Sequence, residues 1–235
     1  MNHHYHKLRH LFYYKNKNNF IKAAITGSLA LLLIAMVLFI DVAPIGPDGT
    51  SIGMSHLNSF FFNLFGVNIV WYHITDWLGV VAILTAFVFA VVGLVQLIKR
   101  RSLFKVDKEI LLLGGLYIIV IGLYILFECA IVNYRPIIMP DGTHPEASFP
   151  SSHTMIVCVI MGSTFSLIAK YIKREKLRDL LRAACIAVIA VTVIGRLISG
   201  VHWFTDILGG LLISASLLAL YFGAVTAINR RQTNG

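Results

Sequence analysis

Residues 195–206 read Gly-Arg-Leu-Ile-Ser-Gly-Val-His-Trp-Phe-Thr-Asp and join two apolar runs that are each long enough to enter a lipid bilayer. The stretch places an arginine, a histidine and an aspartate where ionisable side chains are costly, and such side chains usually mark a functional site. His202 and Asp206 are four residues apart, so on a helix they share one face. An aspartate beside one imidazole nitrogen fixes the tautomer and leaves the other nitrogen free for nucleophilic or general-base chemistry.

Arg196 precedes His202 by six residues, which would put the two side chains on different faces of one unbroken helix. Ser199 and Gly200 lie between them and offer a natural break in the helix. We therefore expect Arg196 to end one helix and His202 to begin the next, so that both side chains point to the same spot.

The composition predicts a membrane protein. The chain of 235 residues is 57% hydrophobic and 13% charged, whereas a soluble domain carries about 25% charged residues. The apolar runs predict an all-α bundle of six transmembrane helices. The predicted spans are residues 21–40, 77–98, 110–127, 155–172, 183–198 and 207–228.

The six spans are expected to form one domain over residues 23–229, flanked by a basic cytoplasmic tail at 1–22 and a short cytoplasmic tail at 230–235. The first apolar run competes with a cleaved signal peptide. It is long for a signal sequence and lacks an A-x-A-like cleavage site after it, so an uncleaved anchor is favoured.

The basic residues predict the orientation. Eighteen of the 20 Lys and Arg residues fall on one side of the six-span arrangement, in residues 1–22, 99–108, 170–182 and the C-terminus. The positive-inside rule makes that side cytoplasmic, and both termini with it. The formal net charge of +9 is thereby explained without nucleic-acid binding. The two exceptions, Arg135 and Arg196, lie in outer loops and have no topological reason to be there.

The region between the first two spans predicts a helix at the membrane surface. Residues 55–65 place leucines and phenylalanines on one face and polar residues on the other, which is typical of a short interfacial helix. Its aromatic residues anchor the loop or, alternatively, gate the access of lipid. Asp76 follows, and we interpret it as a helix N-cap or first-turn acid, with a site residue as the alternative.

Two further outer segments carry polar groups. Arg135 lies in N-Y-R-P just after the third span, and F-P-S-S-H-T brings Ser151, Ser152 and His153 to the start of the fourth. A serine in this position is an ordinary N-cap, but the free N–H groups and the dipole of a helix N-terminus also favour phosphate. We expect these segments to meet residues 195–206 at one membrane depth.

Such a site has the groups for phosphoryl transfer. Two guanidiniums and oriented N–H donors match the oxygens of a phosphate. His202 could attack phosphorus and form a phosphohistidine, while His153 protonates the leaving oxygen and then activates water. The sequence has no constellation of carboxylates for a metal pair, so we expect metal-free chemistry with no cofactor. Three cysteines without a C-x-x-C pattern are expected to be buried free thiols: Cys129, Cys158 and Cys185.

These motifs, R-P, then P-S-S-H, then G-R-x-x-x-x-x-H-x-x-x-D-x-x-x-G, resemble the signature of the type 2 phosphatidic acid phosphatase (PAP2) superfamily. The family includes lipid phosphate phosphatases, undecaprenyl-pyrophosphate phosphatases and vanadium haloperoxidases. The resemblance covers roughly residues 128–210 and implies that His202 is the nucleophile, Asp206 its partner and His153 the acid/base. The phosphate-binding residues that it implies are Arg135, Arg196, Ser151 and Ser152.

Three residues depart from the family pattern. Glu128 stands where the first motif begins with a lysine, seven residues before the arginine. An acid there could repel an anionic substrate, pair with an arginine or stay protonated if buried. Ser152 replaces a glycine of the second motif, and Gly195 replaces a serine of the third.

The resemblance implies an enzyme in the cell membrane that acts on a membrane lipid at the outer face. We expect it to hydrolyse a lipid phosphate or pyrophosphate, of the phosphatidic acid, phosphatidylglycerophosphate or undecaprenyl pyrophosphate type. The alternatives are a lipid phosphotransferase and a non-catalytic lipid-phosphate binder or transporter on the same fold. The sequence gives no oligomeric state.

Overall fold

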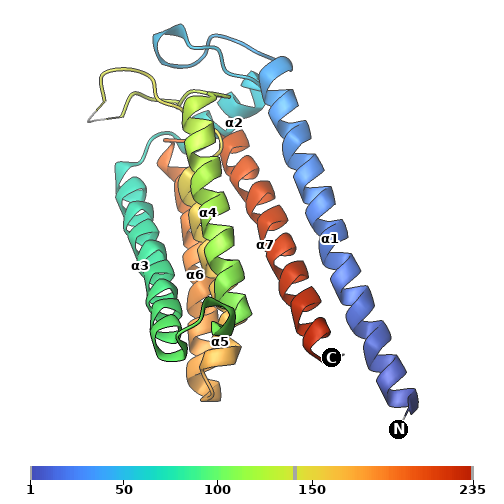
Figure 1. Cartoon of the computed structure of the whole chain (residues 1–235). Helices are drawn as coiled ribbons and strands as arrows, with labels where there is room; N and C mark the ends of the chain where they lie inside the picture. Colours follow the sequence, from blue (N-terminus) through green and yellow to red (C-terminus); the bar gives the residue numbers. More distant parts are fainter. Residues whose placement is uncertain (1, 140–141, 234–235) are drawn as a thin grey trace.

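The computed structural model describes residues 2–139 and 142–233, with side chains for residues 18–139 and 142–229. The α-helices of these residues (Figure 1) are α1 (Asn2–Phe39), α2 (Ser55–Phe65), α3 (Ile69–Arg100), α4 (Lys108–Cys129), α5 (Ser152–Tyr171), α6 (Glu175–Ser199) and α7 (Phe204–Thr233). All except α2 are long and apolar enough to cross a membrane. The predicted all-α bundle of six spans is therefore confirmed. α1 joins the predicted N-terminal tail to the first span, and the side chains of residues 2–17 and 230–233 lie outside the described part.

Two helices begin well before the predicted spans. α3 begins at Ile69 instead of residue 77, because the Asn68 side chain caps it by accepting a hydrogen bond from the Trp71 N–H at 3.3 Å. α6 begins at Glu175 instead of residue 183, and an acid in the first turn suits the positive end of the helix dipole. The added turns mix aliphatic residues with polar or aromatic ones, which lowers their mean hydropathy, so a search for apolar runs does not reveal them.

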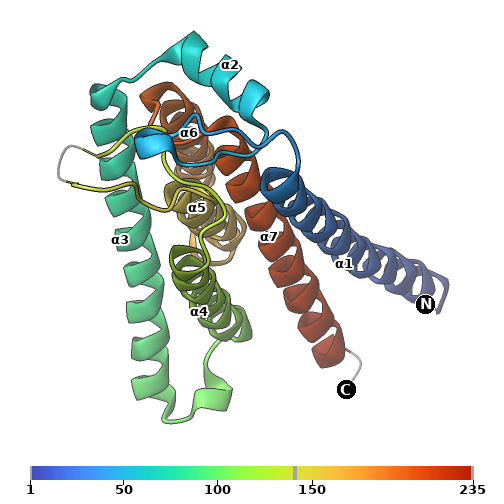
Figure 2. The ribbon, with the colours of Figure 1, turned by 90° about the horizontal axis from the view of Figure 1, so that it is seen from above.

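α5 is the central helix. α3, α4, α6 and α7 pack around it, and α1 packs along α7 (Figure 2). In its most apolar window, 61% of α5 is buried, against 11–22% for the other spans. The outer helices expose Leu, Ile, Val and Phe side chains, as expected for surfaces covered by hydrocarbon. The first turn of α5 is therefore held in the middle of one end of the bundle.

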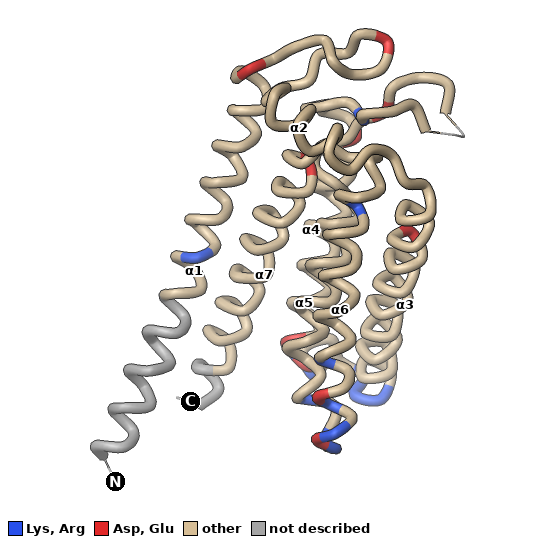
Figure 3. Tube along the Cα trace, turned by 180° about the vertical axis from the view of Figure 1, so that it is seen from behind, with Lys and Arg blue, Asp and Glu red and all other residues tan. Residues whose placement is uncertain are grey.

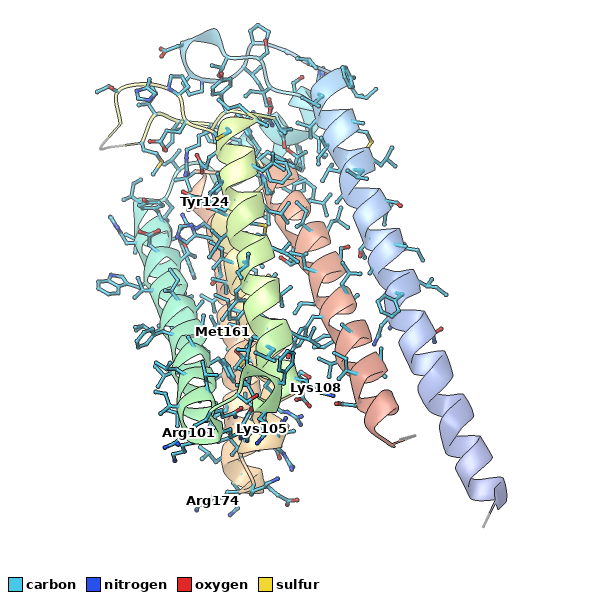
Figure 4. The ribbon with its side chains drawn as sticks, in the orientation of Figure 1. Arg101, Lys105, Lys108, Tyr124, Met161 and Arg174 are labelled. Atoms are coloured by element: carbon cyan, nitrogen blue, oxygen red, sulfur yellow. The ribbon has the colours of Figure 1, made fainter. Side chains whose placement is uncertain are left out.

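The two ends of the bundle differ in charge. Lys and Arg gather where α3 connects to α4 and α5 to α6 (Figure 3), and Figure 4 places Arg101, Lys105, Lys108 and Arg174 there. Tyr124 lies toward the opposite end of α4, which carries α2 and the long connections. α1 begins and α7 ends at the basic end of the bundle (Figure 1). This arrangement agrees with the charge pattern, while the cytoplasmic assignment of that side stays a prediction.

At the basic end, a cluster of polar side chains links three helices. Asp107, just before α4, accepts hydrogen bonds from Arg100 Nη1 at 2.8 Å and from the Tyr171 hydroxyl at 3.0 Å, and Lys170 Nζ lies 3.2 Å away. Its own N–H donates to the Gln96 side chain. Partial burial acts to raise the pKa of Asp107, but these donors outweigh it and lower that pKa to about 2. The cluster thus joins α3, α4 and α5.

The predicted surface helix is present as α2, and it packs against the start of α7. Asn58 is fully buried, donates to the Thr205 hydroxyl at 3.0 Å and accepts from the Thr205 N–H at 3.2 Å. Phe61 stacks on Phe204 with ring centroids 4.1 Å apart, whereas Phe60 remains exposed. One ring of the predicted apolar face therefore serves packing within the protein. The location of α2 at a membrane interface stays a prediction.

The cysteines only partly follow the expectation. Cys158 and Cys185 are buried free thiols, but Cys129, the last residue of α4, is exposed because the chain leaves the bundle at that point.

Candidate active site

The connection from α6 to α7 turns sharply at Gly200. Its φ is +68°, and a Cβ there would lie 2.1 Å from the carbonyl oxygen of Gly66, so only glycine fits. The predicted break between the two helices is located here. α7 begins at Phe204, and His202 therefore lies in the connection, not at the start of a helix. The expectation that one helix face brings His202 to Asp206 was wrong; the turn before α7 brings them together instead.

Ser148 connects His202 to Asp206. His202 Nδ1 is 3.6 Å from Asp206 Oδ2, which is too long for a direct hydrogen bond. The Ser148 hydroxyl lies 3.4 Å from this nitrogen and donates a short hydrogen bond to the same carboxylate oxygen. The Trp203 N–H also donates to that oxygen, at 2.8 Å. The carboxylate is thus fixed at the start of α7, and Nδ1 carries the proton of the neutral ring.

The other nitrogen of His202 is left free. Nε2 has no hydrogen-bond partner among the described residues, and the side chain is only 2% exposed. Burial lowers the pKa of His202 well below its usual value, and the positive charges of Arg135 and Arg196 lower it further. The ring is therefore neutral around pH 7, with its lone pair on Nε2. A neutral, oriented imidazole is the form that can act as a nucleophile.

Arg135 reaches the turn that carries His202. Its Nη1 donates to the carbonyl oxygen of Val201 at 3.4 Å, one residue before the histidine. Its Nε lies 3.1 Å from a carboxylate oxygen of Glu146. The backbone N–H of Arg135 donates to the backbone carbonyl of Glu146 at 2.9 Å. The connection between α4 and α5 thereby folds back on itself and holds the guanidinium in place.

Arg196 comes from the last turn of α6 and is almost completely buried, at 1% exposure. Its Nη2 donates to Asp76 Oδ1 at 2.8 Å, and the guanidinium lies over the ring of Tyr72, 5.1 Å from its centroid. Its Nε has no hydrogen-bond partner among the described residues. A buried donor of this kind is suited to an anion, because a phosphate oxygen would satisfy it.

The start of α5 separates the two predicted serines. Ser151 is the N-cap: its hydroxyl accepts from the Thr154 N–H and hydroxyl, and its own N–H donates to the Asp206 carbonyl at 3.0 Å. The hydroxyl oxygen of Ser151 therefore accepts within the first turn of α5, and its predicted contact with phosphate stays a prediction. Ser152, the first residue of α5, lines the pocket beside His202.

His153 contacts Asp76, a residue whose predicted role was wrong. Asp76 was interpreted as an N-cap or first-turn acid, but α3 begins at Ile69 and places it about two turns inside the helix. Its Oδ1 lies 2.9 Å from His153 Nε2 as well as 2.8 Å from Arg196 Nη2. A carboxylate from α3 therefore joins the acid/base candidate to a phosphate-binding candidate. The alternative of a site residue fits the observed position.

A pocket opens between α4, the connection after it and the start of α5. Groups from the predicted motifs, namely Glu128, Arg135, Ser152 and His202, share its walls with Ser148 and with apolar side chains such as Tyr124 and Phe127. Among the described residues, no group of three or more His, Cys, Asp or Glu side chains is arranged to hold a metal ion. The pocket therefore offers a neutral imidazole and a guanidinium to an incoming anion.

The model of the PAP2 superfamily matches residues 129–230, the segment that contains these groups. This segment is a PAP2 region. Among solved structures, the chain is similar to that of the first transmembrane PAP2 type phosphatidylglycerolphosphate phosphatase from Bacillus subtilis. The TM-score is 0.61 at 18% identity, and the alignment covers 88% of this chain and 97% of that one. A search of curated proteins gives no match.

The resemblance to the PAP2 superfamily is thus confirmed, and the shared architecture extends over most of the chain. Six apolar helices and a transmembrane PAP2 relative of the same fold show that this is a multi-pass membrane protein. Identity at this level establishes the fold of the chain and leaves its reaction to be inferred from the site.

One departure from the PAP2 pattern has a structural reason. Gly195 faces α3, where a Cβ would lie 2.5 Å from Thr75 Cγ2 and 3.0 Å from Trp71 Cε3. The serine expected at this position does not fit against α3 as it is packed here. Another departure, Glu128, is exposed in the last turn of α4 and has no ion pair among the described residues. The possibilities of arginine pairing and of burial therefore do not apply to it.

Proposed function

We propose that the protein is an integral membrane phosphatase that hydrolyses a lipid phosphate or pyrophosphate through a phosphohistidine. The observation that carries the proposal is the state of His202: it is buried, held through Nδ1 by Ser148 and Asp206, without a partner at Nε2 among the described residues, and it lines a pocket together with Arg135. Buried polar atoms usually have a hydrogen-bond partner, and a free lone pair on an oriented, neutral imidazole is what a nucleophile needs.

In the proposed first step, the Nε2 lone pair of His202 forms a bond to phosphorus while the bond from phosphorus to the leaving oxygen breaks. His153 gives its proton to that oxygen, so the lipid leaves as an alcohol or a shorter phosphate. The Asp206 carboxylate stabilises the positive charge that develops on the ring of His202 through Ser148. Arg135 and Arg196 bind the equatorial oxygens of the transferring group.

In the second step, a water molecule attacks phosphorus and gives its proton to His153, which restores the acid. The bond from phosphorus to Nε2 breaks, its electron pair returns to the ring, and inorganic phosphate leaves. The arginines supply the charge stabilisation that a metal ion gives in other phosphatases. We therefore propose a metal-independent reaction, which predicts full activity in the presence of EDTA.

The substrate is proposed to be a lipid because the pocket lies at one end of a six-span bundle, beside Tyr124 and Phe127 of α4. Positive residues gather at the other end, and under the positive-inside rule this supports a pocket that faces the outer side of the membrane. The relative from Bacillus subtilis is a phosphatidylglycerolphosphate phosphatase. Phosphatidylglycerophosphate is accordingly tested beside phosphatidic acid and undecaprenyl pyrophosphate.

The test measures phosphate release by purified protein in detergent and EDTA from these three lipids. His202→Ala should abolish release, and His144→Ala, an exposed histidine outside the pocket, should leave it unchanged. Wild-type protein quenched during turnover of labelled substrate should carry an acid-labile, base-stable phosphate on His202. The proposal is refuted if no lipid releases phosphate, or if His202→Ala releases it as fast as wild type.

Phosphotransfer to another acceptor would use the same phosphohistidine, and only the second step would differ. A phosphorylated lipid or sugar in place of inorganic phosphate, from the same labelled enzyme, would identify that reaction. The non-catalytic alternative rests on Glu128, which stands exposed in the pocket where the PAP2 pattern has a lysine. Activity that appears only in Glu128→Lys would support it.

A further inference from the structure

α3 contributes no residue to the three PAP2 motifs, yet two of its residues meet the ring of His153. Asp76 and Gly79 are three residues apart and therefore lie on the same face of the helix. Asp76 Oδ1 is 2.9 Å from His153 Nε2. Gly79 is buried, and a Cβ on it would lie 2.9 Å from His153 Cδ2 and 3.3 Å from Nε2. The ring thus rests in a notch on α3, with the carboxylate beside it.

The two contacts define how the ring is turned. The atoms nearest to Gly79, Cδ2 and Nε2, form one edge of the imidazole, and Nε2 is also the atom that contacts Asp76. Nδ1 lies on the opposite side of the five-membered ring. It is therefore directed away from α3, and it is the nitrogen that remains for a substrate.

We infer that Asp76 is a positioning residue for the acid/base His153, and that this histidine exchanges protons through Nδ1. The inference rests on the proposed phosphatase function and deepens it. The carboxylate holds the proton of Nε2 and stabilises the imidazolium, so that Nδ1–H is delivered to the leaving oxygen. The bare Nδ1 then accepts a proton from the attacking water, and the ring returns to its first state.

The site would then contain two histidine–aspartate pairs of opposite orientation. His202 is held through Nδ1, by Ser148 and Asp206, and acts through Nε2. His153 is held through Nε2, by Asp76, and acts through Nδ1. This difference suits the two roles, because a nucleophile must present a lone pair while an acid must present a proton.

Asp76 also contacts Arg196, and that contact gives a competing explanation for any loss of activity. The same Oδ1 accepts from Arg196 Nη2 at 2.8 Å, so removing the carboxylate charge disturbs a phosphate-binding group as well. Weakened phosphate binding would slow every phosphate ester alike. A weakened acid would slow only esters whose leaving group needs a proton. The test therefore compares leaving groups.

The experiment measures kcat/KM for an alkyl phosphate and for a nitrophenyl phosphate that carries the same alkyl tail. General acid catalysis contributes about 10²–10⁴-fold, so losing its positioning carboxylate in Asp76→Asn should slow the alkyl ester at least ~10-fold. The nitrophenyl ester, whose leaving group needs no proton, should fall less than ~3-fold. Asp48→Asn, in an exposed turn, is the matched control and should change neither. Equal slowing of both esters, or of neither, overturns the inference.

A second experiment displaces the ring of His153 without replacing a charged residue. Gly79→Ala places a methyl against the edge of His153 and should reproduce the selective loss on the alkyl ester. Gly122→Ala, on α4 with nothing within 4 Å of its Cβ, is the matched control for the added methyl. If Gly79→Ala keeps wild-type rates on both esters, the notch has no role in catalysis.

A measurement without turnover separates this inference from the proposed function. ¹⁵N NMR of histidine-labelled protein in detergent should show His153 protonated at Nε2, with a signal that moves in Asp76→Asn but not in Asp48→Asn. A protein that hydrolyses neither ester refutes the phosphatase proposal, while the NMR result still tests the pairing. A neutral His153 with its proton on Nδ1 would overturn the pairing even in an active enzyme.

Discussion

Restoring the serine that the PAP2 pattern usually carries, by Gly195→Ser, should destabilise this protein. The added Cβ would lie 2.5 Å from Thr75 Cγ2 and 3.0 Å from Trp71 Cε3, where carbon atoms normally keep about 3.5–4.0 Å. Thr75 cannot turn away freely, because its hydroxyl donates to the carbonyl oxygens of Trp71 and Tyr72, both at 2.9 Å. α3 and α6 must therefore separate to admit the new side chain.

Overpacking of this kind costs about 1–3 kcal/mol. For a chain of this size, each kcal/mol lowers the Tm by about 2–4 °C, so a decrease of roughly 2–12 °C is expected. Thr75→Ser removes the methyl group nearest to the clash and keeps the hydroxyl. In the wild-type background it should cost about 1 kcal/mol for the small cavity that it leaves. In the Gly195→Ser background it should be neutral or stabilising.

The assay is thermal unfolding in detergent of the two single variants and the double variant. Gly122→Ser adds the same side chain on α4, where nothing lies within 4 Å, and should leave the Tm nearly unchanged. The steric argument fails if Gly195→Ser melts like Gly122→Ser. It also fails if Thr75→Ser lowers the Tm equally in both backgrounds, because the two sites would then be independent.

Three further predictions follow from the polar contacts. Ser148→Ala should lower kcat/KM about 10- to 100-fold and should also lower the Tm, because a hydrogen bond to a buried charged group is worth about 1.5–3 kcal/mol; steady-state kinetics and melting check this. The lowered pKa of His202 predicts that phosphohistidine formation from a nitrophenyl phosphate continues below pH 6.5, where an ordinary histidine becomes protonated; rapid-quench labelling across pH measures it, and an inflection near 6.5 would contradict it. Asp107→Asn should lower the Tm at pH 7. In the folded protein the pKa of Asp107 is about 2, and in the unfolded chain it is about 4. The Tm difference between Asp107→Asn and wild type should therefore hold above about pH 4 and vanish as the pH falls through 2.

The spans and the three motif segments were predictable because each depends on short stretches of sequence. Apolar runs of bilayer length predict helices, and two arginines outside the basic segments mark the loops that hold the site. The early start of α3 was not predictable from hydropathy. Residues 69–76 mix aromatic and polar side chains, and their helix depends on the Asn68 cap and on packing against α6.

Asp76 and Ser148 show what sequence spacing cannot provide. Asp76 is 120 residues from Arg196, and no periodicity connects the two; their contact depends on how closely α3 packs against α6. Ser148 lies in a loop where serine is common, and only the folded connection places its hydroxyl between His202 and Asp206. For Asp76, one signal was available in the sequence: it is an acid within an apolar helix, and intramembrane acids are seldom without function.

Burial explains why Glu128 need not prevent binding of an anion, although each arginine of the site already faces a carboxylate, Arg135 facing Glu146 and Arg196 facing Asp76. Two charges 4 Å apart interact by about 1 kcal/mol in water and by about 4 kcal/mol near a protein surface, so burial decides which charges matter most. Arg196 is buried, whereas Glu128 is exposed at the pocket and screened by water and salt. The repulsion from Glu128 should therefore weaken phosphate binding by a smaller factor than Arg196 strengthens it.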